Sequence, residues 1–185
     1  MYSEEIHELV YEAYARLANP HGAALRFYDD GQLATLPEGA RQWALGVGNP
    51  VRHAELAADE DVVDLGCGSG VDVLLAAGEV GQGGSVTGID FLAPMLDRGR
   101  QFAAEAGLDN VTFLQSAIED VPLPDQSADV VVSNGAINLS ARKSRVLAEA
   151  HRLLEPGGRV CVSDLTLSDD ELPPEIRTHP SAWAG

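Results

Sequence analysis

The chain has 185 residues, and its 12 lysines and arginines against 29 aspartates and glutamates give a formal net charge of −17. This length suits one domain with a modest core, and a 45% share of apolar residues is typical of a globular protein rather than a disordered acidic tail. The acidic charge argues against nucleic acid as a partner and against an anionic membrane surface, because lysine and arginine supply the affinity for both.

The sequence also predicts a cytoplasmic protein without a membrane span. No apolar run reaches the roughly 20 residues that a spanning helix needs, and the acidic start MYSEEIHE lacks the basic region of a secretory signal peptide. The two cysteines, Cys67 and Cys161, are too few for a disulfide framework or for a zinc site made of cysteines. The histidines show no metal-ligand spacing, so we expect no metal.

The N-terminal part, residues 1–58, is expected to form a helical and loop cap over a cofactor site. Apolar residues recur at helical spacing over residues 3–17 and predict an amphipathic helix. Beyond it the chain is rich in turn signals such as Asp29-Asp30-Gly31. Two short helices are expected in this region, at residues 38–45 and 51–57.

A regular alternation of strands and helices begins at Asp61. The expected strands are residues 62–65, 85–89, 110–114, 129–133 and 159–163, and the expected helices are residues 71–78, 93–107 and 141–154. This alternation, with strands apolar on both faces, predicts an α/β fold that is Rossmann-like and doubly wound, with a mainly parallel sheet of about five strands. The core is expected to span residues 59–167, followed by a tail at residues 168–185, in one structural domain overall.

A glycine-rich loop follows the first expected strand and opens the next helix, in the segment Asp64-Leu65-Gly66-Cys67-Gly68-Ser69-Gly70. Glycines allow a tight turn and let backbone N–H groups come close to a ligand. The dinucleotide fingerprint G-x-G-x-x-G requires a glycine where Val71 stands, which disfavours an NAD-dependent dehydrogenase. Asp90 ends the second expected strand, where a carboxylate can accept both hydroxyls of a ribose.

The acidic residue before the loop favours one cofactor over another. Asp64 would repel a pyrophosphate but tolerates a ligand that carries an amino group and a sulfonium. This difference favours S-adenosylmethionine over NAD. Asn134 and Gly135 end the fourth expected strand, beside the first strand, at the switch point where ligands bind in such sheets.

The glycine loop resembles the first motif of class I S-adenosylmethionine-dependent methyltransferases, and further segments resemble the arsenite methyltransferase branch of that family. These segments are residues 44–50 (ALGVGNP beside SLGCGNP), 118–125 (IEDVPLPD beside IExxPLPD), 133–140 (SNGAINLS beside SNCVINLS), 155–159 and 163–164. The resemblance implies a methyltransferase of Rossmann-like fold that converts S-adenosyl-L-methionine to S-adenosyl-L-homocysteine and requires no metal.

The resemblance also implies roles on the cofactor side. The acid and the glycines of the loop would cradle the methionine part, and Asp90 would hold the ribose. The full set of cofactor-binding residues that we expect is Tyr14, Asp64, Gly66, Cys67, Gly68, Gly70, Asp90, Phe91, Met95, Ala117, Ile118 and Asn134. Within this set Ile118 would pack on the adenine and Asn134 would lie near the transferable methyl. Ala117 stands where the family usually has an acidic residue, so we expect weaker or backbone-only recognition of the adenine amino group.

Catalytic and acceptor residues are harder to assign. No residue is assigned as catalytic, and the candidates are Asn134, Tyr14 and His21. Aromatic residues of the cap are expected to pack, with a substrate wall as the alternative: Phe27, Tyr28 and Trp43.

The sequence does not match the arsenic-binding side of the family. Trivalent arsenic is bound through thiolates, because a soft metalloid prefers soft sulfur ligands. Val47 and Gly135 stand where the family motifs have cysteines, and residues 19–26 contain none. Cys67 lies in the cofactor loop, and Cys161 lies in the fifth strand, where a small buried side chain is the ordinary interpretation. We therefore expect a small-molecule acceptor other than arsenite.

The number of expected strands bears on partners. Class I methyltransferases usually add two strands beyond the five that this sequence supplies, so the strand at residues 159–163 is expected to form an exposed apolar edge. Proteins seldom leave such an edge unprotected. Either the sequence is a fragment or another chain pairs with the edge, and we expect a homodimer or a complementing subunit. The alternative function is a cofactor-binding subunit of a heteromeric or dimeric methyltransferase, inactive alone.

Overall fold

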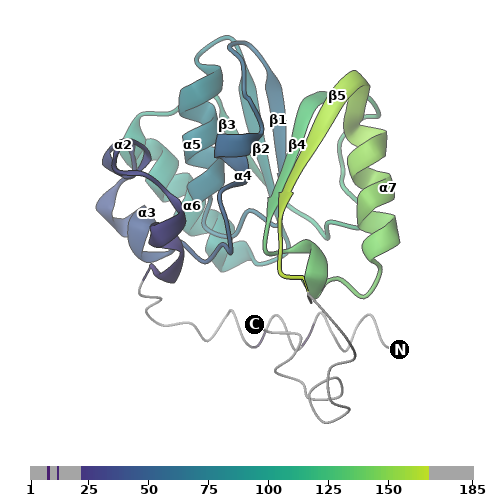
Figure 1. Ribbon diagram of the computed structural model, residues 1–185, viewed down its shortest axis with the longest axis horizontal. Coiled ribbons are helices and arrows are strands. Elements are labelled where there is room, and N and C mark those ends of the chain that lie inside the picture. Colours follow the sequence, from purple (N-terminus) through teal and green to yellow (C-terminus); the bar gives the residue numbers. More distant parts are fainter. Residues whose placement is uncertain (1–7, 9–11, 13–21, 167–185) are drawn as a thin grey trace.

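The computed structural model describes residues 8, 12 and 22–166, and it contains a parallel sheet with helices on both faces (Figure 1). The five strands are β1 (Asp61–Leu65), β2 (Ser85–Asp90), β3 (Val111–Gln115), β4 (Ala128–Asn134) and β5 (Leu154–Ser163). They lie in the order β3-β2-β1-β4-β5, and each neighbouring pair is parallel. Strand order that reverses beside β1 is typical of doubly wound sheets, so the predicted fold class is confirmed.

Helices cover the two faces of the sheet unequally. The helices are η1 (Ala23–Phe27), α2 (Asp30–Thr35), α3 (Glu38–Gln42), α4 (Pro50–His53), α5 (Val71–Val80), α6 (Ala93–Ala106), η2 (Ile137–Leu139) and α7 (Lys143–Leu153), where η marks a 3₁₀ helix. One face packs against α4, α5 and α6, with α3 packed in turn on α6, and the other face packs against α7 (Figure 1). Within the described part of the chain, no helix is long and apolar enough to cross a membrane.

The central strand β1 is buried on both faces, which positions the site at its end. Val62 packs in the cluster beneath α5 and α6, whereas Val63 packs in the cluster beneath α7, because successive side chains of a strand point to opposite faces. Each such buried valine contributes about 1.5–3 kcal/mol relative to an exposed one. Asp64 follows these valines and is only 2% exposed, so the strand carries a carboxylate into the core.

The predicted strands are confirmed, but several boundaries differ from the prediction. The expected helix at residues 38–45 ends at Gln42, because the chain turns there towards the pocket, and that at residues 51–57 is the single turn Pro50–His53. The expected helix at residues 71–78 continues to Val80, where Gly81 ends it. The strand expected at residues 159–163 begins at Leu154 and runs through a register shift.

Three helices of the described region were not predicted, namely η1, α2 and η2. Residues 29–31 are not a simple turn, because Asp29 caps the start of α2. Its carboxylate accepts a hydrogen bond from the N–H of Gln32 at 2.9 Å, and the Gln32 side chain accepts one from the N–H of Asp29. This reciprocal capping satisfies two N–H groups at the helix start. The helix predicted at residues 3–17 lies outside the described residues, apart from positions 8 and 12, which are helical.

The strand β5 lies at one edge of the sheet and has β4 as its one neighbour among the described strands (Figure 1). Val160 and Val162 are 44% and 40% exposed. Cys161 points to the other face and packs against the cluster beneath α5 and α6. Among the described residues, β5 therefore forms the exposed apolar edge that was expected.

Candidate functional site

A pocket lies at the carboxyl ends of β1, β2 and β4, where the strand order reverses. Its described lining residues are Tyr28, Trp43, Leu45, Gly46, Asp64, Gly66, Cys67, Gly68, Ser69, Val71, Asp72, Asp90, Phe91, Leu92, Met95, Ala117, Ile118, Glu119, Asn134, Gly135, Ala136, Leu139 and Ser140. Apolar walls with a few buried polar groups are typical of a site for a cofactor or small molecule.

Most of the predicted cofactor-binding residues meet in this pocket. Those that line it are Asp64, Gly66, Cys67, Gly68, Asp90, Phe91, Met95, Ala117, Ile118 and Asn134. Gly70 is not among the lining residues and has a structural position instead: its φ is +86°, and a Cβ atom there would lie 2.8 Å from the ring of Phe113. Tyr14 and His21 lie outside the described residues.

The glycine loop is held by hydrogen bonds to the end of β2. The N–H groups of Gly66 and Cys67 both donate to the carbonyl oxygen of Ile89, at 2.8 and 2.9 Å. The N–H of Gly68 donates to Oδ2 of Asp90 at 2.8 Å. A pyrophosphate needs N–H groups that point at the ligand. These three N–H groups are used within the protein, so this part of the loop is poorly suited to a dinucleotide.

Two glycines of the loop differ in what a side chain would meet. Gly66 has a φ of +81°, and a Cβ atom there would lie 2.2 Å from the Cβ of Ala136. Gly68 has a φ of +53°, but a Cβ atom there would meet no atom within 4 Å. Backbone geometry favours glycine at both positions. At Gly68 the side of the loop that faces the pocket is open, which leaves space for a ligand to approach the backbone.

Asp90 accepts hydrogen bonds from the backbone and still has acceptor positions for a ligand. It is 7% exposed, and its Oδ1 accepts a hydrogen bond from the N–H of Leu92 at 2.9 Å while its Oδ2 accepts from Gly68. A carboxylate offers about four acceptor positions, so both oxygens can also accept from a diol. Burial raises the pKa of Asp90, and the hydrogen bonds to its oxygens oppose that rise.

Asp64 lies in the pocket wall with an unsatisfied oxygen. The residue is 2% exposed, and its Oδ1 atom has no hydrogen-bond partner. Burial raises the pKa of Asp64 well above its usual value, and the charges of Asp72 and Asp90 raise it further. A buried polar atom without a partner is costly to the fold. A cationic group placed in the pocket would satisfy this oxygen.

Asp72, in the first turn of α5, was not predicted as a site residue. The hydroxyl of Tyr28 donates to its Oδ1 at 2.9 Å, and Nδ2 of Asn134 donates to its Oδ2 at 2.9 Å. Burial raises the pKa of Asp72 from 3.8 to about 6, although these two hydrogen bonds lower it. Burial, followed by the charge of Asp72, raises the pKa of Tyr28, so its hydroxyl remains a donor. A local signal existed, because Asp72 is a carboxylate within an otherwise apolar helix start.

Asn134 links β4 to the segment at residues 46–48. Its Oδ1 accepts hydrogen bonds from the N–H groups of Val47 and Gly48 at 2.8 and 3.0 Å, and its Nδ2 donates to the carbonyl of Gly48 at 2.9 Å. A Cβ atom at Gly46 would overlap the Asn134 side chain, at 2.2 Å from Nδ2. This asparagine therefore fixes the segment that closes the pocket as well as lining the pocket itself.

The two positions where the family motifs have cysteines lie side by side. A Cβ atom at Gly135 would lie 3.4 Å from both methyl carbons of Val47. Cys67 is the one thiol among the described lining residues, and burial raises its pKa well above the usual value. Cys161 is absent from that lining. The pocket therefore presents no pair of thiolates.

Glu119 is, after Asp72, the second acidic residue of the pocket that was not predicted as a site residue. Glu119 is 6% exposed, and its Oε1 accepts a hydrogen bond from the hydroxyl of Ser140. Both residues belong to the segments that resemble the arsenite branch, but their spacing of 21 positions gave no sign that their side chains meet. Glu119 directly follows Ile118, so a carboxylate lies near the position where Ala117 lacks one.

Comparison with known proteins assigns the family. A profile described as a methyltransferase domain matches residues 56–185. The chain belongs to this methyltransferase family. It is a class I member of Rossmann-like fold close to the arsenite branch, because an arsenite methyltransferase from Halobacterium salinarum is 39% identical over 158 residues. That match covers 85% of this chain and 40% of the relative.

Two other methyltransferases agree with this assignment. The crystal structure of an arsenic(III) S-adenosylmethionine methyltransferase from Chlamydomonas reinhardtii has a TM-score of 0.72 and 40% identity, covering 82% of this chain and 53% of that one. A demethylmenaquinone methyltransferase from Listeria monocytogenes is 36% identical over 104 residues, which are 56% of this chain and 44% of the relative. The chain thus spans about half of these proteins or less.

Proposed function

We propose that this chain transfers a methyl group from S-adenosylmethionine to a small-molecule acceptor other than arsenite. The observation that carries the proposal is Asp64, whose unsatisfied buried oxygen lies in the pocket close to Asp72. These carboxylates favour a cation, and the N–H groups of the glycine loop that would bind a pyrophosphate are already used. S-adenosylmethionine carries an ammonium and a sulfonium, so its charges match this wall.

The lining residues fit the parts of such a cofactor. Asp90 would accept hydrogen bonds from the two ribose hydroxyls, and Asp64 and Asp72 would face the cationic end. The adenine would pack between Phe91, Met95 and Ile118, whose apolar surfaces suit a planar base. The cofactor supplies an electrophilic methyl group on its sulfonium.

The chain contributes mainly orientation and a dry site. Its apolar walls exclude water, and the segment held by Asn134 fixes the side of the pocket from which an acceptor would approach. Holding an acceptor and a methyl group at attack distance accounts for about 7–11 kcal/mol of a barrier in well-oriented reactions. Such catalysis requires no covalent step on the protein.

The acceptor side argues against arsenite. Val47 and Gly135 lie in contact where a thiolate pair would be needed, and Cys67 is a single buried thiol at the cofactor loop. A soft metalloid is poorly held by one protonated thiol and aliphatic carbons. This supports an organic acceptor, although relatives of this chain act on arsenite.

Calorimetry on the purified chain tests the cofactor. S-adenosylmethionine should bind and NADH should not, and Asp64→Asn should weaken the binding of S-adenosylmethionine by about tenfold or more, because it removes a carboxyl group that can ionise beside the bound cation. Equal binding of both cofactors, or an unchanged affinity in the variant, would contradict the proposal. Methyl transfer by the isolated chain to an organic acceptor would exclude the alternative of a subunit that is inactive alone.

The exposed edge of β5 supports a partner for this chain. We propose that a second copy or a complementing subunit adds a strand beside Val160 and Val162, because an apolar edge without a further neighbour among the described strands is an attractive template for pairing. Sedimentation should then detect an assembly that the charged variant Val162→Lys dissociates. A wild-type chain that sediments as a free monomer would refute this part of the proposal.

A further inference from the structure

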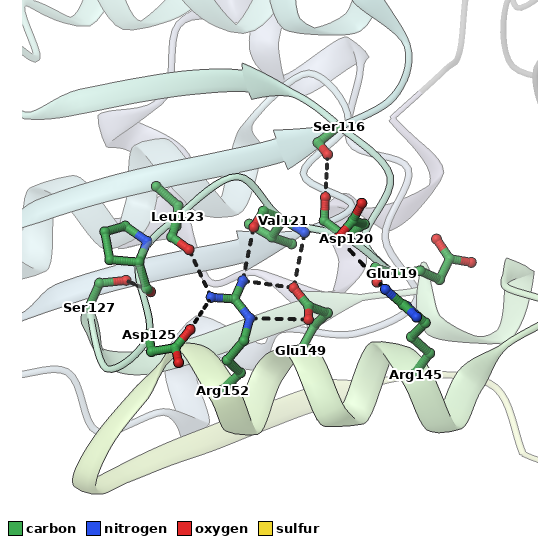
Figure 2. Close-up of polar contacts among 11 residues, drawn as sticks. Ser116, Glu119, Asp120, Val121, Leu123, Asp125, Ser127, Arg145, Glu149 and Arg152 are labelled. Atoms are coloured by element: carbon green, nitrogen blue, oxygen red, sulfur yellow. Dashed lines mark hydrogen bonds and ion pairs between the residues drawn. The ribbon is translucent and has the colours of Figure 1, made fainter.

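The loop between β3 and β4 forms one wall of the pocket and is attached to α7 from behind. Ala117, Ile118 and Glu119 line the pocket, and the loop continues through Val121 to Asp125. Figure 2 shows that side chains of α7 reach this loop, and α7 covers the face of the sheet opposite α5 and α6. The wall therefore has a support that lies outside the pocket.

Arg152 of α7 provides the main attachment. Its Nη2 donates to the carbonyl of Val121 at 2.9 Å, and its Nη1 donates to the carbonyl of Leu123 and to Oδ1 of Asp125, both at 2.8 Å (Figure 2). Its Nε and Nη2 also donate to the carboxylate of Glu149 at 3.1 and 2.8 Å. All five N–H donors of a guanidinium are thereby used.

Glu149, the ion-pair partner of Arg152, also binds the loop directly. Oε2 of Glu149 accepts the N–H of Val121 at 3.0 Å, so the N–H and the carbonyl of Val121 are both bound by this ion pair (Figure 2). The side chain of Val121 is 4% exposed and packs beneath α7. The Arg152 guanidinium lowers the pKa of Glu149, which keeps the pair charged.

Arg145, two turns earlier on α7, binds the backbone of Glu119, which lines the pocket. Its Nε donates to the carbonyl of Glu119 at 2.9 Å, and its Nη2 lies 3.7 Å from the carboxylate of Asp120 (Figure 2). Ser116 donates from its hydroxyl to the carbonyl of Asp120 at 2.7 Å. The backbone that follows Ile118 is thus held at three successive residues, Glu119, Asp120 and Val121.

We propose that Arg152, Glu149 and Arg145 are positioning residues that set the pocket wall at residues 117–119 and thereby the affinity for the adenine end of the cofactor. The inference rests on the proposed cofactor. It differs from a purely structural role, because the ion pairs bind the backbone of the same loop whose other side faces the ligand. Displacing that loop moves the apolar surface of Ile118 away from a planar base.

The chain contains a matched control at the opposite end of the sheet. Arg159 donates to the carbonyls of Ala54 and Glu55 and forms an ion pair with Glu60 at 2.7 Å. It therefore has the same kind of contacts as Arg152, but at the start of β1, remote from the pocket. Arg152→Met and Arg159→Met should both lower the unfolding temperature.

The two variants should differ in ligand binding. Calorimetry with S-adenosylhomocysteine and with adenosine should show affinities about tenfold weaker for Arg152→Met, by the same factor for both ligands, and unchanged for Arg159→Met. Arg152→Lys keeps the positive charge but lacks the planar set of guanidinium N–H donors, so it should show a smaller loss of affinity. Wild-type affinity in Arg152→Met, measured well below its unfolding temperature, would overturn the inference.

Two further measurements distinguish a failure of this inference from a failure of the proposed cofactor. If Arg152→Met does not fold, Arg145→Met reports on the same wall through its hydrogen bond to Glu119, and it should weaken adenosine binding by about threefold or more. Unchanged binding in that variant would also overturn the inference. A wild-type chain that binds neither ligand would instead refute the proposed cofactor.

Discussion

Asn134 and Asp72 lie 62 positions apart in the sequence, and Nδ2 of the asparagine donates a hydrogen bond to Oδ2 of the aspartate at 2.9 Å. Tyr28 donates to the other oxygen, and burial raises the pKa of Asp72 to about 6. A carboxylate that changes charge in this range lies in the wall of the pocket. The charge of the pocket should therefore depend on pH near neutrality.

Affinity for the cationic cofactor should increase as the pH rises from about 5 to about 7, because Asp72 becomes ionised over this range and then attracts the cation. Calorimetry in buffers of different ionisation enthalpy should detect proton release on binding near pH 6. In Asp72→Asn the affinity should be lower and the dependence flatter. The amide in this variant can still accept from Asn134 and donate to Tyr28. A profile equally steep in this variant would assign the titration to another group.

Stability should change in the opposite direction. The pKa of Asp72 in the folded state lies above its ordinary value of 3.8, so the proton stabilises the fold. This contribution is fully present below about pH 4 and is lost as the pH rises through about 6, and it amounts to roughly 3 kcal/mol for a shift of this size. Asp72→Asn carries no such titrating group. In urea unfolding, the free energy of unfolding of the variant should therefore exceed that of the wild type by an amount that grows with pH. A constant difference would contradict the assignment.

Replacing Asp90 should affect both the loop and the ligand. Asp90→Ala removes the acceptor for the N–H groups of Gly68 and Leu92, so the free energy of unfolding should fall by about 2–3 kcal/mol. Affinity for S-adenosylhomocysteine should fall by about a hundredfold, because two hydrogen bonds to a charged acceptor are lost. Asp97→Ala, which changes an exposed carboxylate on α6, should leave the affinity unchanged. Retained affinity in Asp90→Ala would refute the ribose assignment.

Gly68 and Gly107 form a matched pair for testing how closely a ligand approaches the loop. Both have a positive φ, +53° and +67°, and a Cβ atom at either meets no atom within 4 Å. Each alanine variant should lose about 1–2 kcal/mol of stability from the backbone conformation. Only Gly68→Ala should also weaken the binding of S-adenosylhomocysteine, by about tenfold. Equal binding by the two variants would mean that the ligand does not approach Gly68.

A pair of thiols introduced at the acceptor side should create an arsenic site. The double variant Val47→Cys with Gly135→Cys places sulfur atoms at two positions in contact, at a cost of about 1–2 kcal/mol because residue 135 has a φ of +73°. With a phosphine as reductant, this variant should bind phenylarsine oxide more tightly than the wild type or Val47→Cys alone. Equally tight binding by the wild type would contradict the exclusion of arsenite.

The sheet and half of the site could be predicted because their signals are local. Strands such as β1 are apolar on both faces, and the spacing from Asp64 to Gly68 fixes the loop that follows. Asp90 was predictable because the carboxyl ends of neighbouring parallel strands meet at one edge of the sheet. Each of these inferences needs only a short stretch of sequence and the topology.

The rest of the site depends on contacts between distant residues. Tyr28 meets Asp72 across 44 positions, and Glu119 meets Ser140 across 21. The pattern of apolar residues in the sequence does not reveal such pairs. Their side chains lie on loops and at helix starts, and packing decides the directions in which these side chains point. The capping of α2 by Asp29 was missed for a different reason, because the Asp-Asp-Gly segment suits both a turn and a helix start.

The contact between Asn134 and the segment at residues 46–48 has a consequence for evolution. The asparagine binds main-chain atoms of Val47 and Gly48, so the fold of this segment does not depend on which side chain residue 47 carries. Val47 borders Gly135 of the pocket wall, so a mutation at residue 47 can alter the surroundings of that wall through this contact and leave the glycine loop undisturbed. Side chains at residue 47 can therefore vary in such a protein while the hydrogen bonds that hold residues 46–48 stay the same.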